Sequence, residues 1–216
     1  MESPIRRFGA IGDVHAEDTF LAAALDTLRG EKLDAIFCVG DIVDGRGDVD
    51  RCCALLAQHG VLAVRGNHER WLLKDEMRAL PKAHQLDDLA PVTRAYLEAL
   101  PATRRVSTTH GPLLVCHGLG DNDMTRLRPY DEGYALETND ALTALRATDY
   151  TLVVGGHTHL RMVRSFGALT VVNAGTLSYT DTPYFLVADL QERHVQYYDL
   201  DDDARVLPAE RYPLGS

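Results

Sequence analysis

The sequence predicts one α/β domain in which parallel βαβ units are followed by a β-rich part. The first indication lies between residues 6 and 80, where an apolar strand-like run, a polar loop and a helix-like stretch recur three times. This alternation is typical of parallel βαβ units. The second indication lies between residues 162 and 200, where four strand-like runs follow one another without a helical pattern. No internal repeat, low-complexity tract or linker is found, so we expect a single domain over residues 1–216.

Apolar patterning predicts the strands and helices of the N-terminal part. Short apolar runs that end at glycine or at polar residues predict strands at residues 6–12, 35–39 and 61–64. Helices are predicted at residues 18–29 and about 49–59. In the first helix Asp18 or Thr19 can cap the N-terminus. Its apolar face is formed by Phe20, Leu21, Ala24, Leu25 and Leu28.

The middle of the chain departs from this alternation. Two helices are predicted at residues 71–80 and 91–100, joined by a polar link, and Pro101 ends the second. They form either a small helical cap over the site, at residues 70–101, or ordinary core and surface packing. A hairpin is predicted from residues 104–108 and 112–116, with His110 and Gly111 at its turn.

The C-terminal part is expected to be mostly sheet. After a polar loop at residues 119–133, a helix is predicted at about 136–147 and an apolar strand at 150–154. Four further strands are predicted at residues 162–166, 169–172, 184–190 and 195–200. The acidic run of Asp201, Asp202 and Asp203 is interpreted as a solvated turn and not as an ion site.

Composition is typical of a soluble globular protein. The 216 residues suffice for one domain with a proper core, and 45% of them are hydrophobic. No apolar run is long enough to cross a bilayer, and no long apolar segment follows Arg6 and Arg7, so we expect neither a membrane association nor a signal peptide. The four cysteines lack CxxC spacing and are interpreted as free thiols. We therefore expect a cytoplasmic protein.

The formal net charge of -10 argues against one class of ligand, the nucleic acid polymers. Tight binding of a nucleic acid polymer requires basic patches, so none is expected as a partner. A site for a small anionic substrate would need local positive charge, and bound metal ions are one way to supply it.

Polar residues at the strand ends predict one functional site. They are Asp13 and His15, Asp41 and Asp44, Asn67 and His68, His117, and His157 and His159. Gly40 lets the backbone turn sharply, so that Asp41 can leave its strand and point into a cleft. Open sheets bind ligands at the carboxyl ends of their strands. A single Asp/Gly turn or a lone histidine would be an ordinary structural feature, but five such strand ends together indicate a site.

The donor atoms of these residues favour transition metals. Mixed imidazole and carboxylate ligands suit zinc, iron or manganese, whereas calcium and magnesium prefer oxygen alone. The set is too large for one ordinary metal site and suits two metals that share a bridging carboxylate. In the pair His157 and His159, an irregular backbone would let both side chains reach the same cleft.

These motifs, in this order, resemble those of the calcineurin-like metallophosphoesterase superfamily. The blocks are DxH at Asp13, GDxxD at Gly40, GNHE at Gly66, a lone His117, and GHTH at Gly156. The resemblance implies a two-sheet β-sandwich flanked by helices, which agrees with βαβ units followed by β-rich sheet. It also implies hydrolysis of phosphoric esters by in-line attack of a hydroxide held between two metal ions.

The resemblance also implies a role for each residue. The first metal would be bound by Asp13, His15 and His159, the second by Asn67, His117 and His157, and Asp41 would bridge them. His68 would bind phosphate and protonate the leaving oxygen, Asp44 would orient His68, and Asn67 would also contact substrate. We expect two divalent or trivalent ions, with manganese active in vitro and iron or zinc as alternatives.

Two positions depart from the patterns of particular branches. The protein-phosphatase branch carries GDxVDRG, whereas here Gly45 separates Asp44 from Arg46, so the arginine is displaced by one position. Arg46 is nevertheless predicted to bind substrate. Small bacterial phosphodiesterases of the superfamily often carry cysteine at the position of His68, and the histidine favours a competent general acid.

Substrate selection is expected to depend on the loops. Residues 118–124 follow His117 directly, and Arg126, Arg128 and Tyr130 either contact a phosphate or a base or belong to a solvated loop. Residues 173–176 either border the site or form a plain turn.

The predicted function is a phosphoesterase acting on small phosphodiesters or phosphomonoesters, with nucleotide-like molecules among them. The enzymatic alternatives are a serine/threonine protein phosphatase and a dinucleoside-polyphosphate hydrolase. A non-catalytic scaffold, like the retromer subunit of this fold, is disfavoured because all seven ligands and His68 are present. The oligomeric state, the substrate and the native metal are left open.

Overall fold

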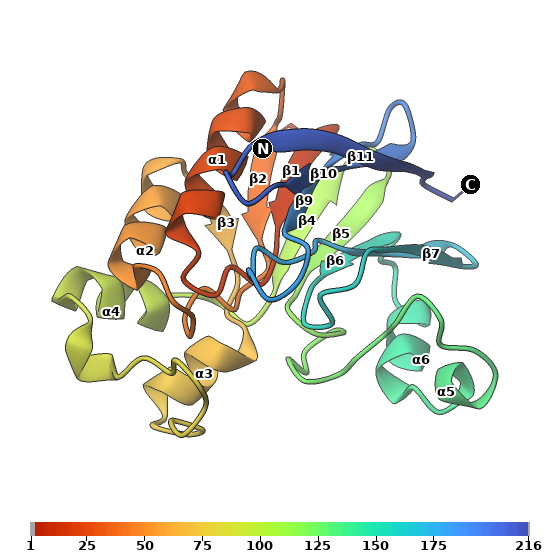
Figure 1. Ribbon diagram of the computed structural model, residues 1–216. Coiled ribbons are helices and arrows are strands. Elements are labelled where there is room, and N and C mark those ends of the chain that lie inside the picture. Colours follow the sequence, from red (N-terminus) through yellow and green to blue (C-terminus); the bar gives the residue numbers. More distant parts are fainter. Residues whose placement is uncertain (1–2, 216) are drawn as a thin grey trace.

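Two β-sheets lie face to face at the centre of the computed structural model, which describes residues 3–215 (Figure 1). Helices cover the outer face of each sheet. This is the sandwich flanked by helices that the sequence predicts.

The first sheet contains six strands in the order β11-β10-β9-β1-β2-β3. They are β1 (Arg7–Ile11), β2 (Ala35–Cys38), β3 (Leu62–Ala63), β9 (Tyr184–Asp189), β10 (His194–Leu200) and β11 (Val206–Pro213). β1, β2 and β3 are parallel, with α1 (Asp18–Gly30) and α2 (Val49–Gln58) as the crossovers. This confirms the predicted βαβ units. β9, β10 and β11 are antiparallel to their neighbours.

The second sheet contains five strands in the order β4-β5-β6-β8-β7. They are β4 (Arg104–Thr108), β5 (Gly111–Val115), β6 (Leu152–Gly155), β7 (Met162–Phe166) and β8 (Leu169–Asn173). β4 and β5 form the predicted hairpin, and β5, β6 and β8 run parallel. The β-rich C-terminal part is thus divided between the two sheets.

Apolar side chains fill three layers. Between the sheets, the rings of Phe8 and Phe37 meet edge to face with centroids 5.3 Å apart, and they pack in one cluster with Val115 and Val154 of the second sheet. A second layer lies between the first sheet and α1, α2 and α4 (Pro91–Glu98), and a third between the second sheet and α6 (Asp140–Arg146). Burial of this surface fixes the strands whose carboxyl ends carry the polar residues.

Two further expectations concern the cysteines and the membrane. The four cysteines are free and buried, as predicted. Burial raises the pKa of Cys38 and of Cys116 to about 12, so both thiols stay protonated near neutral pH. None of the helices among residues 3–215 has both the length and the apolar character needed to span a bilayer.

The helix predicted at residues 71–80 is wrong. α3 (Asn67–Leu73) begins four residues earlier and ends at Leu73 with Lys74 as its C-cap, after which Asp75 and Met77 adopt positive φ. The next residues are drawn toward Asp44, because Arg78 and His84 both hydrogen-bond to it. A 3₁₀ turn, η1 (Leu86–Asp88), then leads to α4, which lies where the sequence predicts a helix.

Two other elements differ from prediction. The helix predicted at residues 136–147 is broken into α5 (Tyr134–Glu137) and α6, because the side chain of Asn139 caps α6 by accepting from the Leu142 N–H at 3.0 Å. β11 was not predicted. Its sequence contains Pro208 and Pro213, which argue against a strand, but proline is tolerated at the edge of a sheet, where β11 lies.

Candidate metal centre

The predicted site residues meet where the carboxyl ends of strands from both sheets come together. Asp13 follows β1, Asp41 follows β2, and Asn67 follows β3 as the first residue of α3. His117 follows β5 and His157 follows β6 of the second sheet. The site therefore lies at the junction of the two sheets (Figure 1).

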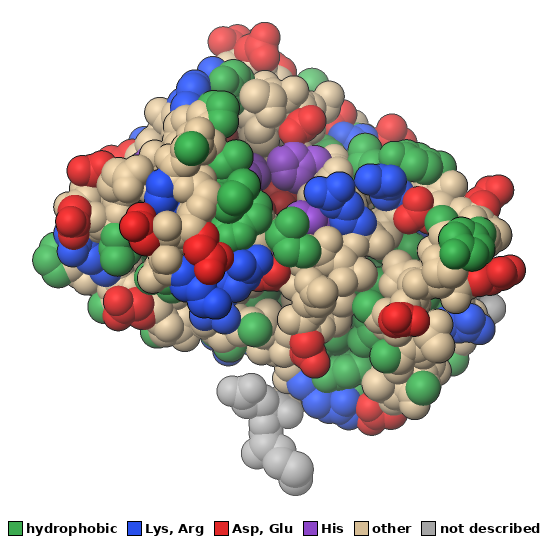
Figure 2. Space-filling model, turned by 90° about the horizontal axis from the view of Figure 1, so that it is seen from below, with side chains coloured by type: hydrophobic (Ala, Val, Ile, Leu, Met, Phe, Trp, Pro, Cys, Tyr) green, Lys and Arg blue, Asp and Glu red, His purple; other side chains and the backbone are tan. Residues whose placement is uncertain are grey.

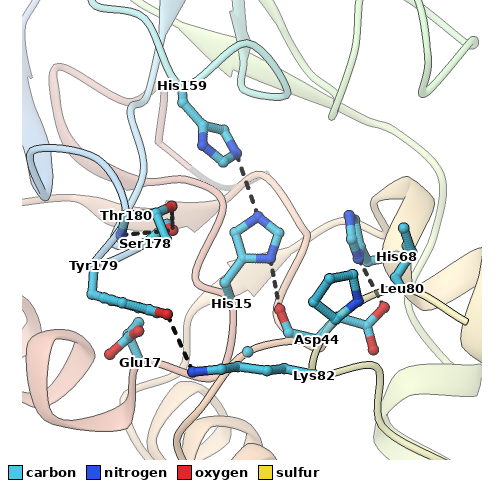
Figure 3. Close-up of a pocket in the computed structure, with 12 residues that line it drawn as sticks. His15, Glu17, Asp44, His68, Leu80, Lys82, His159, Ser178, Tyr179 and Thr180 are labelled. Carbon is cyan, nitrogen blue, oxygen red and sulfur yellow. Dashed lines mark hydrogen bonds and ion pairs between the residues drawn. The ribbon is translucent and has the colours of Figure 1, made fainter.

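One cluster contains Asp13, His15 and His159, whose ligand atoms all lie within 4.8 Å of one another. His159 Nε2 is 3.5 Å from Asp13 Oδ1. It also lies 3.3 Å from His15 Nε2 (Figure 3). Two imidazole nitrogens that face each other need a proton or a cation between them. The donor set fits a transition-metal ion, as the sequence predicts for the first metal.

A second cluster contains Asp41, His117 and His157. His117 Nε2 lies 3.1 Å from Asp41 Oδ2 and 2.9 Å from Asn67 Oδ1, so Asn67 belongs to the same group. His117 Nδ1 faces the carbonyl oxygen of Val39 at 2.8 Å. That contact leaves Nε2 directed into the cluster and, when Nε2 is a metal ligand, fixes the tautomer.

Asp41 connects the two clusters. It also forms a group with His15 and His68 in which the ligand atoms lie within 4.8 Å of one another. Its Oδ2 is 3.1 Å from His117 and 3.9 Å from His68. Asp41 is therefore the carboxylate whose position suits a bridge between two ions.

Many of these residues lie in unusual backbone conformations. Positive φ is found at Asp13, His15, Asp41, Asp44, His157 and His159. Such conformations are uncommon outside glycine and cluster at functional sites. Gly40 has φ +95°, and a Cβ there would lie 2.4 Å from the Gly66 nitrogen. The sharp turn predicted at Gly40 is thus confirmed, and it requires glycine.

Glu69 holds the loop that carries Asp41. Its buried carboxylate accepts from the N–H groups of Asp41 (2.9 Å), Ile42 (2.6 Å), Val43 (3.1 Å) and Gly66 (2.8 Å). Burial and the nearby charge of Asp41 raise the pKa of Glu69 above its ordinary value. In the sequence Glu69 is the last residue of the GNHE motif, and no local pattern indicates this role.

His68 and Asp44 form the predicted pair. His68 Nδ1 is 2.8 Å from Asp44 Oδ2 (Figure 3), and the Trp71 ring packs against the imidazole with centroids 4.8 Å apart. Burial alone would lower the pKa of His68, but the hydrogen bond to Asp44 and the charge of Asp41 outweigh it and raise that pKa. Both carboxylates thus favour the protonated form of His68.

Asp44 has two partners that sequence reasoning missed. Arg78 donates to both carboxylate oxygens at 2.9 Å, and the His84 N–H donates to Oδ1 at 2.9 Å. Although burial would raise the pKa of Asp44, the hydrogen bonds from His68, His84 and Arg78 hold it well below its usual range. No local pattern marks Arg78, because its partner lies 34 residues away.

The histidines of the clusters differ in protonation without bound metal. Burial would lower the pKa of His117, yet the charge and hydrogen bond of Asp41 raise it to about 10. Contact with Asp13 and Asp181 likewise overcomes burial and raises the pKa of His159 to about 9. Burial and the charge of His117 lower the pKa of His157 to about 4.

A cleft of about 300 Å³ opens beside the clusters. It is lined by His15, Glu17, Asp44, Gly45, His68, Leu80, Pro81, Lys82, His159, Ser178, Tyr179 and Thr180. Figure 2 shows histidines at the bottom of a hollow, with hydrophobic side chains on one side and Lys or Arg side chains on the other. Figure 3 shows the residues that line the cleft.

The remaining sequence predictions concern substrate contacts. Arg46 pairs with Glu17 at 3.2 Å and stacks on Tyr179, 3.5 Å from the ring centroid, at the edge of the cleft. Arg126 Nε lies 3.3 Å from His157 Nε2, so this arginine reaches the second cluster. Arg128 instead lies beside Tyr130, 6.0 Å from its ring centroid.

Residues 173–176 border the site. Asn173 donates to the Gly156 carbonyl at 2.8 Å, and the Thr176 hydroxyl donates to the Asp13 carbonyl at 3.0 Å. These bonds hold the segments on which Asp13 and His157 are placed. Of the two interpretations of this segment, the structure supports the one that borders the site.

Comparison with known families identifies the superfamily of the chain. The model of the calcineurin-like phosphoesterase superfamily domain matches residues 7–193. The chain belongs to this superfamily. The calcineurin-like phosphoesterases are metal-dependent, and the clusters around Asp13 and His117 are where the residues of this chain could hold metal ions.

Curated relatives of this phosphoesterase match only in part. It is 33% identical over 66 residues to an uncharacterized protein of Methanocaldococcus jannaschii, covering 31% of the chain and 27% of the relative. It is 36% identical over 69 residues to serine/threonine-protein phosphatase 1 of Salmonella typhimurium, covering 32% of each protein. The match thus spans about a third or less of these relatives.

Among solved structures, the phosphoesterase resembles a metallophosphoesterase from Sphaerobacter thermophilus. The TM-score is 0.68 at 20% identity, over 90% of this chain and 88% of the other. This likeness concerns the fold.

Proposed function

We propose that this phosphoesterase uses two metal ions to hydrolyse phosphodiester or phosphomonoester bonds of small substrates. The observation that carries the proposal is the position of Asp41, which lies within ligand distance of His117 and His157 and also of His15 and His68. One carboxylate between two groups of imidazoles is the arrangement that a bridged pair of ions needs.

The donor set supports transition metals. Imidazole nitrogens outnumber carboxylates in both clusters, which suits manganese, iron or zinc better than calcium or magnesium. We propose manganese as the ion that supports activity in vitro. When bound, two such ions would supply a nucleophilic water and neutralise charge on the phosphoryl group.

His68 is proposed as the general acid. Its Nδ1 faces Asp44 at 2.8 Å, which leaves the Nε2 proton free to be given to the leaving oxygen. Asp44 keeps the ring oriented and favours its charged form. Asn67 and Arg126 are positioned to contact phosphoryl oxygens, since each lies within 3.3 Å of a histidine of the second cluster.

The size of the cleft supports a small substrate. A volume of about 300 Å³ lies at the lower end of the range for small-molecule sites, about 300–1,000 Å³. Charged and aromatic side chains around it suit a phosphorylated small molecule, with nucleotide-like compounds among the candidates. Arg46 is proposed to contact such a substrate only after exchanging its present partner, Glu17.

The test compares hydrolysis of bis-p-nitrophenyl phosphate and p-nitrophenyl phosphate with manganese, without added metal and with chelator. Metal-dependent cleavage of the diester supports a phosphodiesterase, and cleavage of the monoester alone supports a phosphatase. His68→Ala should remove most of the turnover while bound metal, measured by elemental analysis, stays the same. Full activity of that variant would disprove the proposed role of His68.

A serine/threonine protein phosphatase is the second candidate. The observation in its favour is the 36% identity over 69 residues to the Salmonella phosphatase. Release of phosphate from a phosphopeptide, with no cleavage of the aryl diester, would favour it. Hydrolysis of a dinucleoside polyphosphate, measured as the nucleotides formed, tests the other enzymatic alternative. A metal-loaded protein that cleaves none of these would favour the scaffold.

A further inference from the structure

We propose that Lys82 binds a second anionic group of the substrate, so that the preferred substrate carries two phosphoryl groups. The inference rests on the proposed function, because one phosphoryl group has to lie at the metal centre. Lys82 lines the same cleft as His15, His68 and His159 (Figure 3). A small molecule bound at the histidines can therefore reach Lys82 without leaving the cleft.

Charge pairing around the cleft leaves Lys82 as a cation without a carboxylate partner among the described residues. The two acidic residues of the lining already have partners, since Glu17 pairs with Arg46 at 3.2 Å and Asp44 with Arg78 at 2.9 Å. Among residues 3–215, no carboxylate lies within 4.0 Å of the Lys82 ammonium group. An ammonium group without a counter-ion at the cleft favours an anionic ligand.

The hydrogen bonds of Lys82 lead to the same conclusion. Its Nζ donates to the Tyr179 hydroxyl at 3.2 Å and lies 4.9 Å from the centroid of that ring. An ammonium group has three donor hydrogens, so two stay available for phosphoryl oxygens. Tyr179 belongs to the opposite loop and also stacks with Arg46. The ring thus holds Lys82 in place before the ligand arrives, which lowers the entropy cost of binding.

The backbone at Lys82 is unusual for lysine. The Ala83 N–H donates to the Leu80 carbonyl at 3.1 Å, which closes a turn with Pro81 in the second position and Lys82 in the third. Lys82 has φ +59° there. A turn with proline second and positive φ third favours glycine in the third position. Because glycine would fit the turn conformation better than lysine, we infer that lysine is present at this position for its side chain.

The test uses competitive inhibition of bis-p-nitrophenyl phosphate hydrolysis by three compounds that share one nucleoside. They are adenosine 5′-monophosphate, adenosine 5′-diphosphate and adenosine 3′,5′-bisphosphate. The measured quantity is, within each variant, the ratio of the inhibition constant of the monophosphate to that of each two-phosphate compound. In Lys82→Gly this ratio should fall about tenfold, the size expected for one charged hydrogen bond.

Matched variants separate binding from structure. Lys82→Gly relieves the positive φ, so its melting temperature should equal or exceed that of the wild type. Lys74→Ala removes the same charge from the end of α3, outside the cleft lining, and should leave the ratio unchanged. Lys82→Arg keeps a cation and should restore part of the ratio.

Each outcome decides the inference. A fall in the ratio for the diphosphate alone would indicate a phosphate chain, and a fall for the bisphosphate alone would indicate two separate phosphates. Unchanged ratios for both compounds would overturn the role of Lys82 while the proposed function stands. Absence of turnover in the metal-loaded wild type would reject the proposed function, and calorimetric titration with the same three compounds would then test Lys82 separately.

Discussion

Arg78 donates to both carboxylate oxygens of Asp44, with its Nη1 2.9 Å from Oδ1 and its Nη2 2.9 Å from Oδ2. The same Oδ2 faces His68 at 2.8 Å. Arg78 lies on the segment between α3 and α4, so this ion pair ties that segment to the proposed general acid. The pair is well shielded, because only 10% of the Arg78 side chain and 2% of the Asp44 side chain are exposed.

Loss of the pair between Arg78 and Asp44 should lower kcat more than it weakens substrate binding. Arg78→Ala removes two of the hydrogen bonds that hold Asp44 beside His68, so we expect kcat to fall about tenfold while KM and metal content change less than about twofold. Arg78→Lys keeps the charge but not the two-pronged contact and should restore only part of the rate. Steady-state kinetics and elemental analysis measure both quantities.

Arg94→Ala is the control for this prediction. Arg94 lies on α4 and pairs at 3.3 Å with Asp87, whose side chain is 98% exposed, so its loss should leave kcat unchanged. A drop in metal content for Arg78→Ala as large as its drop in kcat would show that Arg78 supports the metal centre and not His68.

Replacing Glu69 by glutamine should destabilise the metal-binding loop. Glu69 Oε1 accepts from Ile42 and Val43, and Oε2 accepts from Asp41 and Gly66. Whichever way the amide turns, its NH₂ group faces two N–H donors, and buried donors without acceptors cost about 1–3 kcal/mol each. We expect a lower melting temperature and weaker metal binding.

Thermal unfolding with and without manganese measures the effect of Glu69→Gln. Excess metal should recover part of the lost stability, because metal binds only the folded loop. Glu76→Gln serves as the control. Glu76 is half exposed and forms a surface pair with Arg70 at 3.4 Å, which is expected to contribute little to stability. Equal melting temperatures for the two variants would contradict the role given to Glu69.

The structure also joins the two halves of the site through Arg70 and Asp123. Arg70 follows Asn67 and His68 on α3, and Asp123 lies in the loop after His117. Arg70 Nε is 2.7 Å from Asp123 Oδ2, and Nη2 is 2.9 Å from Oδ1. Arg70→Ala should weaken metal binding at the second cluster, to which Asn67 and His117 belong, several-fold. Little loss of stability is expected, because the pair is partly exposed.

A double-mutant cycle with Asp123→Ala tests this contact. If the pair acts as a unit, the double variant binds metal no more weakly than either single variant. Additive losses of metal affinity would mean that Arg70 and Asp123 act independently. Their contact would then have no role in connecting α3 to the loop after His117.

The residues proposed to bind metal could be identified from the sequence because their signal is local. Each strand is a short apolar run, and the ligand follows within a few residues, so the fold brings Asp13, Asp41 and His117 together once the strands are aligned. Positive φ at six of the site residues is also consistent with the Asp and His content of those turns.

The partners of those residues could not be predicted in the same way. Arg78 contacts Asp44, which lies 34 residues away in the chain, and Glu69 contacts Asp41, 28 residues away. No local sequence pattern indicates either contact. The helix predicted at residues 71–80 failed for the same reason, since bonds to Asp44 overrode a helical pattern. β11 was missed because an exposed edge strand with two prolines lacks the apolar run that marks the other strands.

Metal affinity should rise with pH up to about pH 9 or 10. In the metal-free protein His117 has a pKa of about 10 and His159 of about 9, so both are charged at neutral pH. Metal coordination needs neutral imidazole, so one proton must leave each cluster on binding. Below these pKa values the apparent affinity of each cluster should therefore rise about tenfold per pH unit, and the rise should stop above them.

Calorimetric titration of the chelator-treated protein with manganese measures this proton release. Repeating the titration at pH 7 in buffers of different ionisation enthalpy should give about one proton released per bound ion. His110→Ala is the control, because His110 lies outside the clusters and its pKa is lowered by burial, so its loss should leave the count unchanged. Binding without proton release would mean that His117 and His159 are already neutral in the metal-free protein, which would contradict this prediction.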